Sequence, residues 1–125
     1  MDKLVGQING KFSTPNWSPI RYIYGCISQS ELAGLQFFRE NVKYLCFHDF
    51  SRNFFPGFYR DADVGLVTPM RDGMNLVAKE FAACRVEKPG VLILSPFAGA
   101  GEMMHEALSV NPYEISNVAS VLNRY

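Results

Sequence analysis

Hydrophobic patterning in the second half of the chain predicts two buried strands with a helix between them. The runs DVGLVTP (63–69) and VLILS (91–95) are almost continuously apolar. They lack the alternation of apolar and polar residues found in a strand with one solvent-exposed face. Continuous runs of this length are typical of parallel strands that helices cover on both sides. The intervening segment NLVAKEFAACR (75–85) has helical periodicity instead. Its predicted apolar face consists of Leu76, Val77, Phe81 and Cys84.

The flanking segments continue an alternating order of strands and helices. FYRDA (58–62) is predicted to close a helix before the first strand, and FAGAGEMMHEAL (97–108) to form a helix after the second. Asn111 and Pro112 predict a turn, and residues 113–125 a last helix. This order predicts a right-handed βαβ unit, so we assign the chain to the α/β class, with parallel strands and flanking helices.

The first half of the chain is less regular. Residues 1–27, which glycines and prolines interrupt, are predicted to form a loop or irregular hairpin and then a short strand, IRYIYGCI (20–27). Ser28, with Glu31 three residues later, matches a capping box and predicts a helix start. Residues 35–57 carry aromatic and charged side chains without helical or strand periodicity, and are predicted to be irregular.

Composition favours one small globular domain in the cytoplasm. The 125 residues include 48% hydrophobic and 19% charged residues with zero formal net charge, so we expect neither nucleic acid nor an anionic membrane as a partner. The chain has three cysteines, Cys26, Cys46 and Cys84, which form no CxxC motif. An odd number would leave one cysteine without a disulfide partner, which favours reduced thiols over a disulfide framework. No apolar run reaches the roughly 20 residues of a membrane span, and the first residues lack the pattern of a secretory signal.

The turn after the first predicted strand, RDGMN (71–75), has the features of an anion-binding helix start. Gly73 allows a ligand close to the backbone, and ligands of open α/β sheets bind at the carboxyl ends of strands. Glu80 and Asp72 can accept hydrogen bonds from the hydroxyls of a ribose or a sugar. Four backbone amides are expected to be free and to attract phosphate, those of Met74, Asn75, Leu76 and Val77. On spacing alone, an ordinary capped helix explains the same residues.

Other candidate chemistry is discounted. DAD (61–63) has the spacing of a metal-binding DxD motif, but it precedes the strand and therefore belongs to the end opposite the turn. Capping or solvation is the better interpretation of these carboxylates. His48 and His105 have no ligand partner at helical spacing, so we expect no metal. The sequence shows no Ser/His/Asp or Cys/His constellation for nucleophilic catalysis.

Three segments, in a fixed order, carry a resemblance to a known family. They are INGKFSTPNWSPIRYIYG (8–25), VGLVTPMRDGMNLVAKEFAAC (64–84), and GVLILSPFAGAGEMM (90–104) with LSVNPYEISNVASVLN (108–123). Together they resemble the trehalose-6-phosphate synthases, glycosyltransferases of the GT-B type with two Rossmann-like domains. The resemblance implies that residues 1–125 are part of the C-terminal, UDP-glucose-binding Rossmann-like domain.

The resemblance also implies a reaction. Synthases of this kind transfer glucose from UDP-glucose to glucose 6-phosphate with retention, and form trehalose 6-phosphate and UDP without a cofactor or metal. The leaving diphosphate oxygen would take the acceptor proton, so the protein would supply placement and stabilisation of phosphate charge. Glucose 6-phosphate would bind through an N-terminal domain that this sequence lacks, and the isolated chain is therefore expected to be inactive.

Site residues follow from the resemblance, position by position. Asp72 and Gly73 would contact the donor glucose and are the implied catalytic residues. Glu80 would bind the ribose, and the main chain near Ile27 would lie by the uracil. The diphosphate and part of the glucose would be held by the amides of Met74, Asn75, Leu76 and Val77.

Two alternatives to a synthase fragment stay open. One is a non-catalytic, synthase-like module that binds UDP-sugar or associates with other, full-length synthase subunits. An upstream exon for the acceptor domain would favour the enzyme, whereas a genuine start at Met1 would favour the module. The other is a gene-model product without a stable fold, which circular dichroism of the chain would detect.

Residues 35–57 have no counterpart in the family pattern. Joining Gly34 directly to Phe58 gives SELAG-FYRDADVGLVTP, which reads as the uninterrupted family helix and strand. The last residues of the segment, NFFPG, can be encoded as a pyrimidine tract followed by CAGG, the form of a 3′ splice boundary. We therefore predict a non-family insertion, and more specifically a translated intron. The alternative is a genuine surface insertion, because loops tolerate added length at low cost.

Transcript sequencing across this junction tests the intron hypothesis. We expect most messages to lack the codons for residues 35–57, because their removal restores the family helix and strand. A dominant message that retains all of these codons would exclude the intron and favour the surface insertion.

Overall fold

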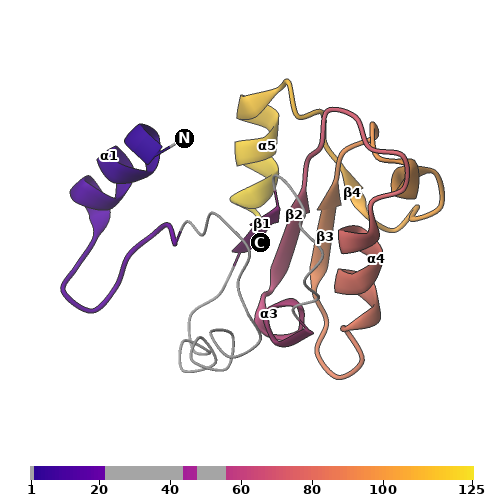
Figure 1. Ribbon diagram of the computed structural model, residues 1–125, viewed down its shortest axis with the longest axis horizontal. Helices are drawn as coiled ribbons and strands as arrows, with labels where there is room; N and C mark the ends of the chain where they lie inside the picture. Colours follow the sequence, from indigo (N-terminus) through magenta and orange to yellow (C-terminus); the bar gives the residue numbers. More distant parts are fainter. Residues whose placement is uncertain (1, 22–43, 48–55) are drawn as a thin grey trace.

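Four parallel strands form the centre of the structure (Figure 1). The computed structural model describes residues 2–21, 44–47 and 56–125. The sheet order is β1-β2-β3-β4. The strands are β1 (Tyr44–Phe47), β2 (Val64–Val67), β3 (Val91–Leu94) and β4 (Leu108–Ser109). The helices are α1 (Asp2–Phe12), α3 (Pro56–Asp61), α4 (Leu76–Ala83), the 3₁₀ helix η2 (Gly99–Glu102) and α5 (Ile115–Leu122).

The two strands predicted from continuous apolar runs pair with each other as expected. Val64 of β2 lies opposite Val91 of β3, and the register continues to Val67 opposite Leu94. The amide of Ser95 donates to the carbonyl of Val67 at 2.9 Å, which extends the ladder by one residue. Helix α4 connects β2 to β3, so the predicted parallel strand–helix–strand unit is confirmed.

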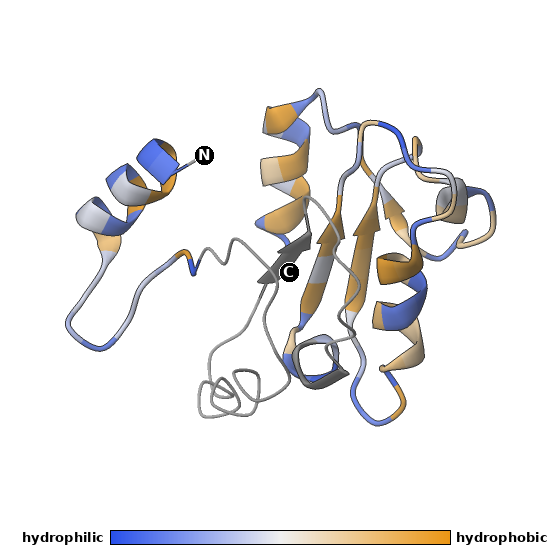
Figure 2. Cartoon of the chain, viewed as in Figure 1, coloured by the Kyte–Doolittle hydropathy of each residue, from blue (hydrophilic) through white to orange (hydrophobic). Residues whose placement is uncertain are grey.

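Helices cover both faces of this sheet, which confirms the α/β class. Figures 1 and 2 show α4 on one side of the apolar strands β2 and β3 and α5 on the other. Val67 turns toward α4 and packs with Val77 and Phe81. Val64 and Leu66 turn the other way, against the α5 side, in a cluster with Ile93, Val110, Val118, Val121 and Leu122.

The contact between α4 and β2 is unusually close because Gly65 has no side chain. A Cβ added at Gly65 would lie 2.9 Å from Cδ2 of Phe81, and Phe81 itself is 1% exposed. The helix therefore rests directly on the backbone of the strand. This contact fixes the height of α4 above the sheet, and with it the position of the turn that begins the helix.

The predicted helix over residues 97–108 is wrong for most of its length. The chain makes only the short 3₁₀ helix η2 and then turns into β4, whose Leu108 pairs with Ile93. Gly99 and Gly101 lower helix propensity, and Ala98 before them is extended at φ −91° and ψ 131°. The segment forms a loop-like connection at the sheet edge because its backbone is hydrogen-bonded to the loop that follows β2.

The N-terminal prediction of a loop or irregular hairpin is also wrong, because residues 2–12 form α1. Apolar residues at helical spacing explain the difference, and they are Leu4, Val5, Ile8 and Phe12. Among residues 2–21, a hairpin-like contact follows the helix, where Thr14 and Trp17 form an antiparallel bridge. Helix α1 has no buried residue and stands apart from the sheet in Figure 1.

The segment 35–57 is not irregular throughout, contrary to prediction. Residues 44–47 form β1, which pairs in parallel with β2 so that Tyr44 lies opposite Val64. Pro56 and Gly57 belong to α3. The local run YLCF is apolar and contains two aromatic residues, which suits a short strand. Whether this segment is an insertion relative to the family stays a prediction.

Several sequence-based expectations lie outside the described residues. They concern the strand over 20–27 beyond its first two residues, the helix start at Ser28, and the position of Ile27. Within the ranges that the structure covers, no helix combines the length and apolar character needed to cross a membrane. The described residues thus include the strand-to-helix turns but not residues 22–25, the last part of the resembling upstream segment.

Substitution of Gly65 tests the close packing of α4 on β2. Gly65→Ala is expected to lower the free energy of unfolding by about 1–3 kcal/mol, because the new methyl group overlaps the Phe81 ring. Gly6→Ala is the matched control, since a Cβ at Gly6 meets no atom within 4 Å and alanine favours the helix. Urea unfolding measures both; equal stability of the two variants would contradict the proposed contact.

Candidate functional site

The candidate site lies where β2 and β3 end at their carboxyl edges. Two loops meet there, one running from Thr68 to the start of α4 and the other from Ser95 to η2 (Figure 1). The amide of Asp72 donates to the carbonyl of Phe97 at 3.1 Å, and the amide of Gly99 donates to the carbonyl of Asp72 at 3.1 Å. These bonds form a short parallel bridge that fixes the two loops to each other.

Asp72 also organises its own turn through its carboxylate. Oδ1 accepts the amides of Met74 at 3.1 Å and Asn75 at 2.9 Å, while Oδ2 accepts the side-chain amide of Asn75 at 2.8 Å. The expectation that the amides of Met74 and Asn75 are free is therefore wrong, because both donate to the Asp72 carboxylate.

Asn75 begins helix α4 in a conformation that few residues adopt. Its backbone is left-handed, with φ 60° and ψ 88°, a region that asparagine enters more readily than most residues. Its side-chain oxygen accepts the amide of Ala78 at 2.9 Å, so Asn75 is the N-cap of the helix. The sequence interpretation of a capped helix start is confirmed in this respect.

The amides of Leu76 and Val77 are the donors that remain at the helix start. Both belong to the first turn, where no helical acceptor exists, and neither has an acceptor among the residues that the structure describes. Leu76 is 54% exposed, so its predicted place on the buried face of the helix is wrong, whereas Val77 is buried as expected. Two backbone donors at a helix start, beside the open space in front of Gly73, are suited to an anion.

Gly73 and Gly99 differ in what a side chain would meet. A Cβ at Gly73 has no atom within 4 Å, so the space in front of this backbone is open. A Cβ at Gly99 would lie 2.1 Å from the carbonyl oxygen of Gly73, so only glycine permits the two loops to approach. Sequence reasoning missed Gly99, although a glycine-rich segment directly after the next strand was an available signal.

Glu80 accepts a hydrogen bond from a residue that sequence reasoning also missed. The hydroxyl of Tyr59, on α3, donates to Oε2 of Glu80 at 3.0 Å. Tyr59 is fully buried, and this burial, followed by the bond to Glu80, raises the pKa of its hydroxyl. The hydroxyl is therefore protonated at neutral pH and acts as the donor.

The DAD carboxylates have the role expected from their position before β2. Asp63 pairs with Lys88 at 2.6 Å and Asp61 with Arg60 at 3.0 Å, both at the surface. They lie at the opposite end of the strand from Asp72. Exposed pairs of this kind contribute little to stability.

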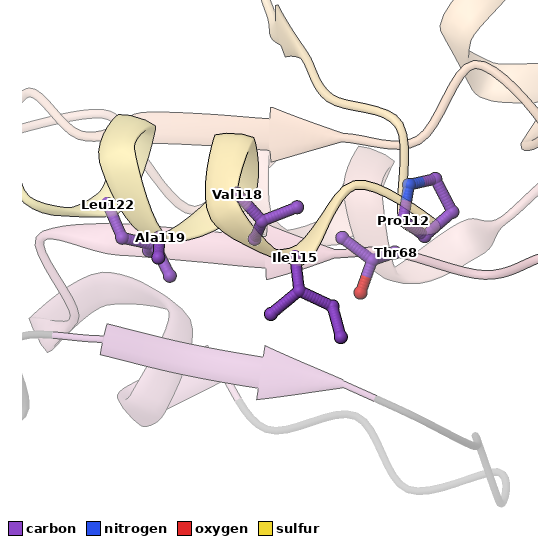
Figure 3. A pocket seen from close by; sticks show the side chains of 6 residues that line it. All are labelled: Thr68, Pro112, Ile115, Val118, Ala119 and Leu122. Atoms are coloured by element: carbon purple, nitrogen blue, oxygen red, sulfur yellow. The ribbon is translucent and has the colours of Figure 1, made fainter.

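A second concavity lies beside the carboxyl end of β2, on the α5 side of the sheet (Figure 3). Its volume is about 230 Å³ and its walls are mostly apolar. The lining residues are Thr68, Pro112, Ile115, Val118, Ala119 and Leu122. With no charged side chain in this lining, the groove does not have the chemistry of a phosphate site.

Comparison with known proteins gives a consistent result over most of the chain. The model of glycosyltransferase family 20 matches residues 41–124. Trehalose-6-phosphate synthase of Salmonella paratyphi B is 42% identical over 120 residues, which are 95% of this chain and 20% of that relative. The chain thus spans about one fifth of the length of the curated relatives that it matches.

Solved structures of two relatives are similar in fold as well as sequence. A structure from E. coli with UDP-2-fluoro glucose bound is 39% identical, with a TM-score of 0.72. The match covers 98% of this chain and 22% of that structure. An alpha,alpha-trehalose-phosphate synthase (UDP-forming) from Burkholderia xenovorans, in complex with glucose-6-phosphate, is 40% identical with a TM-score of 0.72. The match again covers 98% of this chain and 22% of that structure.

Substitution of Gly99 tests whether the two loops depend on their close approach. Gly99→Ala is expected to displace the turn at Asp72 and to lower the free energy of unfolding by about 1–3 kcal/mol, because its methyl group overlaps the Gly73 carbonyl. Gly101→Ala is the control, since its Cβ would lie 3.4 Å from the nearest atom. Amide resonances of residues 72–75 should shift only in Gly99→Ala; unshifted resonances would show that the loops do not need this contact.

Proposed function

The chain belongs to glycosyltransferase family 20, and we propose that it is part of the donor-nucleotide half of a trehalose-6-phosphate synthase. The proposed reaction transfers glucose from UDP-glucose to glucose 6-phosphate with retention, and forms trehalose 6-phosphate and UDP. The relatives with UDP-2-fluoro glucose and with glucose-6-phosphate bound support these substrates. The observation that carries the proposal is the pair of amides at the start of α4 that have no acceptor in the described part of the chain.

Leu76 and Val77 are proposed to hold the diphosphate through these amides. The two N–H groups lie in the first turn of a helix whose dipole favours negative charge there. The open space in front of Gly73 lets the donor approach the same backbone. A diphosphate bound here would leave as UDP, and the amides would stabilise the charge that develops on its oxygen.

Asp72 is proposed to contact the donor glucose without giving up its structural bonds. An ionised carboxylate offers about four acceptor positions. Bonds from Met74 and Asn75 occupy two positions at Oδ1 and one at Oδ2, so one position at Oδ2 is left for a sugar hydroxyl. Gly73 would lie against the same sugar. The amides of Met74 and Asn75 would bind the glucose and the diphosphate once their hydrogen bonds to Asp72 are replaced by hydrogen bonds to the ligand.

Glu80 is proposed to bind the ribose hydroxyls. It lies on α4 beyond the two amides, so a nucleotide whose diphosphate binds at the helix start can extend its ribose toward this carboxylate. Oε2 accepts from Tyr59, and among the described residues Oε1 has no donor. The main chain near Ile27 is proposed to lie by the uracil.

The proposed mechanism uses no side-chain nucleophile, cofactor or metal. The leaving diphosphate oxygen takes the proton of the acceptor hydroxyl on the face of the sugar where the new bond forms. Glucose 6-phosphate is proposed to bind to a part of the enzyme that this chain does not contain, so the isolated chain binds donor but does not turn over. The proposed location is the cytoplasm, with other synthase subunits as candidate partners.

Calorimetric titration of the chain with UDP tests this function through Glu80. Wild-type chain is expected to bind UDP, and Glu80→Gln to weaken binding by about 1–3 kcal/mol, because a charged acceptor of the ribose is lost. Glu87→Gln is the matched control, since Glu87 is exposed in the connection between α4 and β3. Wild-type chain that does not bind UDP would refute the function, and unchanged affinity of Glu80→Gln would remove Glu80 from the site.

A further inference from the structure

We propose that Tyr59 is a positioning residue of the donor site, whose hydroxyl holds the Glu80 carboxylate in the orientation that receives the ribose. This inference rests on the proposed function, because it assumes that Glu80 binds the ribose. Tyr59 would not touch the nucleotide itself. It would act through one oxygen of Glu80 and leave the other for the ligand.

The Tyr59 side chain is held by packing on all sides, whereas the Glu80 side chain is only partly enclosed. The Tyr59 ring is fully buried, in a cluster that includes Ala62, Ala78 and Phe81, and its hydroxyl lies 3.0 Å from Oε2 of Glu80. Glu80 is only partly buried, and a free glutamate side chain samples many rotamers. A bond from a fixed hydroxyl reduces this freedom before the nucleotide arrives, so less ordering remains for the binding step.

Protonation makes the direction of this bond unambiguous. Burial, and then the neighbouring Glu80, raise the pKa of the Tyr59 hydroxyl, so it carries its proton at neutral pH. The proton is donated to a carboxylate, which accepts charge-assisted bonds that are stronger than neutral ones. A buried tyrosine hydroxyl needs a partner of this kind, and Glu80 supplies it.

A second contact holds α3 and α4 together at the other end. Nη1 of Arg85, directly after α4, donates to the carbonyl of Arg60 on α3 at 2.8 Å. The guanidinium also lies over the ring of Phe81, 4.5 Å from its centroid. Arg85 thus adds a second contact between the two helices. The distance from Tyr59 to Glu80 is therefore set by packing rather than by the bond alone.

Comparing nucleotides with and without ribose hydroxyls distinguishes a positioning role of Tyr59 from a general effect on folding. The chain, Tyr59→Phe and the control Tyr125→Phe are titrated with UDP and with 2′,3′-dideoxy-UDP, which lacks the hydroxyls that Glu80 would bind. Phenylalanine keeps the buried ring, and Tyr125 loses an equivalent but exposed hydroxyl. We expect Tyr59→Phe to bind UDP about 2- to 12-fold more weakly, the range for one hydrogen bond. Its affinity for the dideoxy nucleotide should equal that of wild-type chain, and Tyr125→Phe should change neither.

The double variant tests whether Tyr59 acts through Glu80. Tyr59→Phe combined with Glu80→Gln should bind UDP no more weakly than Glu80→Gln alone, because the acceptor that the hydroxyl positions is already altered. Additive losses, unchanged UDP affinity in Tyr59→Phe, or equal losses for UDP and its dideoxy analogue would each overturn the positioning role. These results leave the proposed function intact as long as wild-type chain prefers UDP to the analogue. Wild-type chain that binds neither nucleotide would overturn both.

Discussion

The backbone bridge between Asp72 and the segment Phe97–Gly99 is the interaction on which the site depends. It joins two loops that follow neighbouring strands, and it exists only because Gly99 lets the carbonyl of Gly73 come close. Once Asp72 is held by its backbone, its carboxylate can gather the amides that follow it. The left-handed turn at Asn75 and the first turn of α4 then have a defined starting point.

Support for the site comes from rigid elements beneath the loops. Helix α4 lies on β2 without an intervening side chain at Gly65, and Tyr59 from α3 reaches its flank. The amides and the carboxylate of α4 that are proposed to bind a sugar nucleotide are therefore carried by a helix whose position is fixed by packing. The proposed reaction would mainly require placement of the donor and stabilisation of phosphate charge, and for this purpose such an arrangement is more useful than a reactive side chain.

Asp72 has a structural role that is compatible with its proposed ligand role. Its carboxylate holds the turn with three bonds and keeps one acceptor position open, so sugar contact and loop integrity are not exclusive. Met74 and Asn75 are in a different situation, since their amides are already used by Asp72. Among the described residues the amides of Leu76 and Val77 have no acceptor, so they are proposed as the more direct anion site, and the amides of Met74 and Asn75 would become available to a ligand through exchange.

The sequence by itself determined the elements with strong local patterns: β2, β3, α4, α5, and the surface role of the DAD carboxylates. It did not determine the loop-like course of residues 97–108, the helix at residues 2–12, or the strand at residues 44–47. The tertiary structure alone paired Tyr59 with Glu80, 21 residues apart, and brought Gly99 against Gly73. The reason is physical. Periodicity records which face of an element is buried, whereas a contact between distant residues depends on how separate elements pack and leaves no periodic trace in the chain.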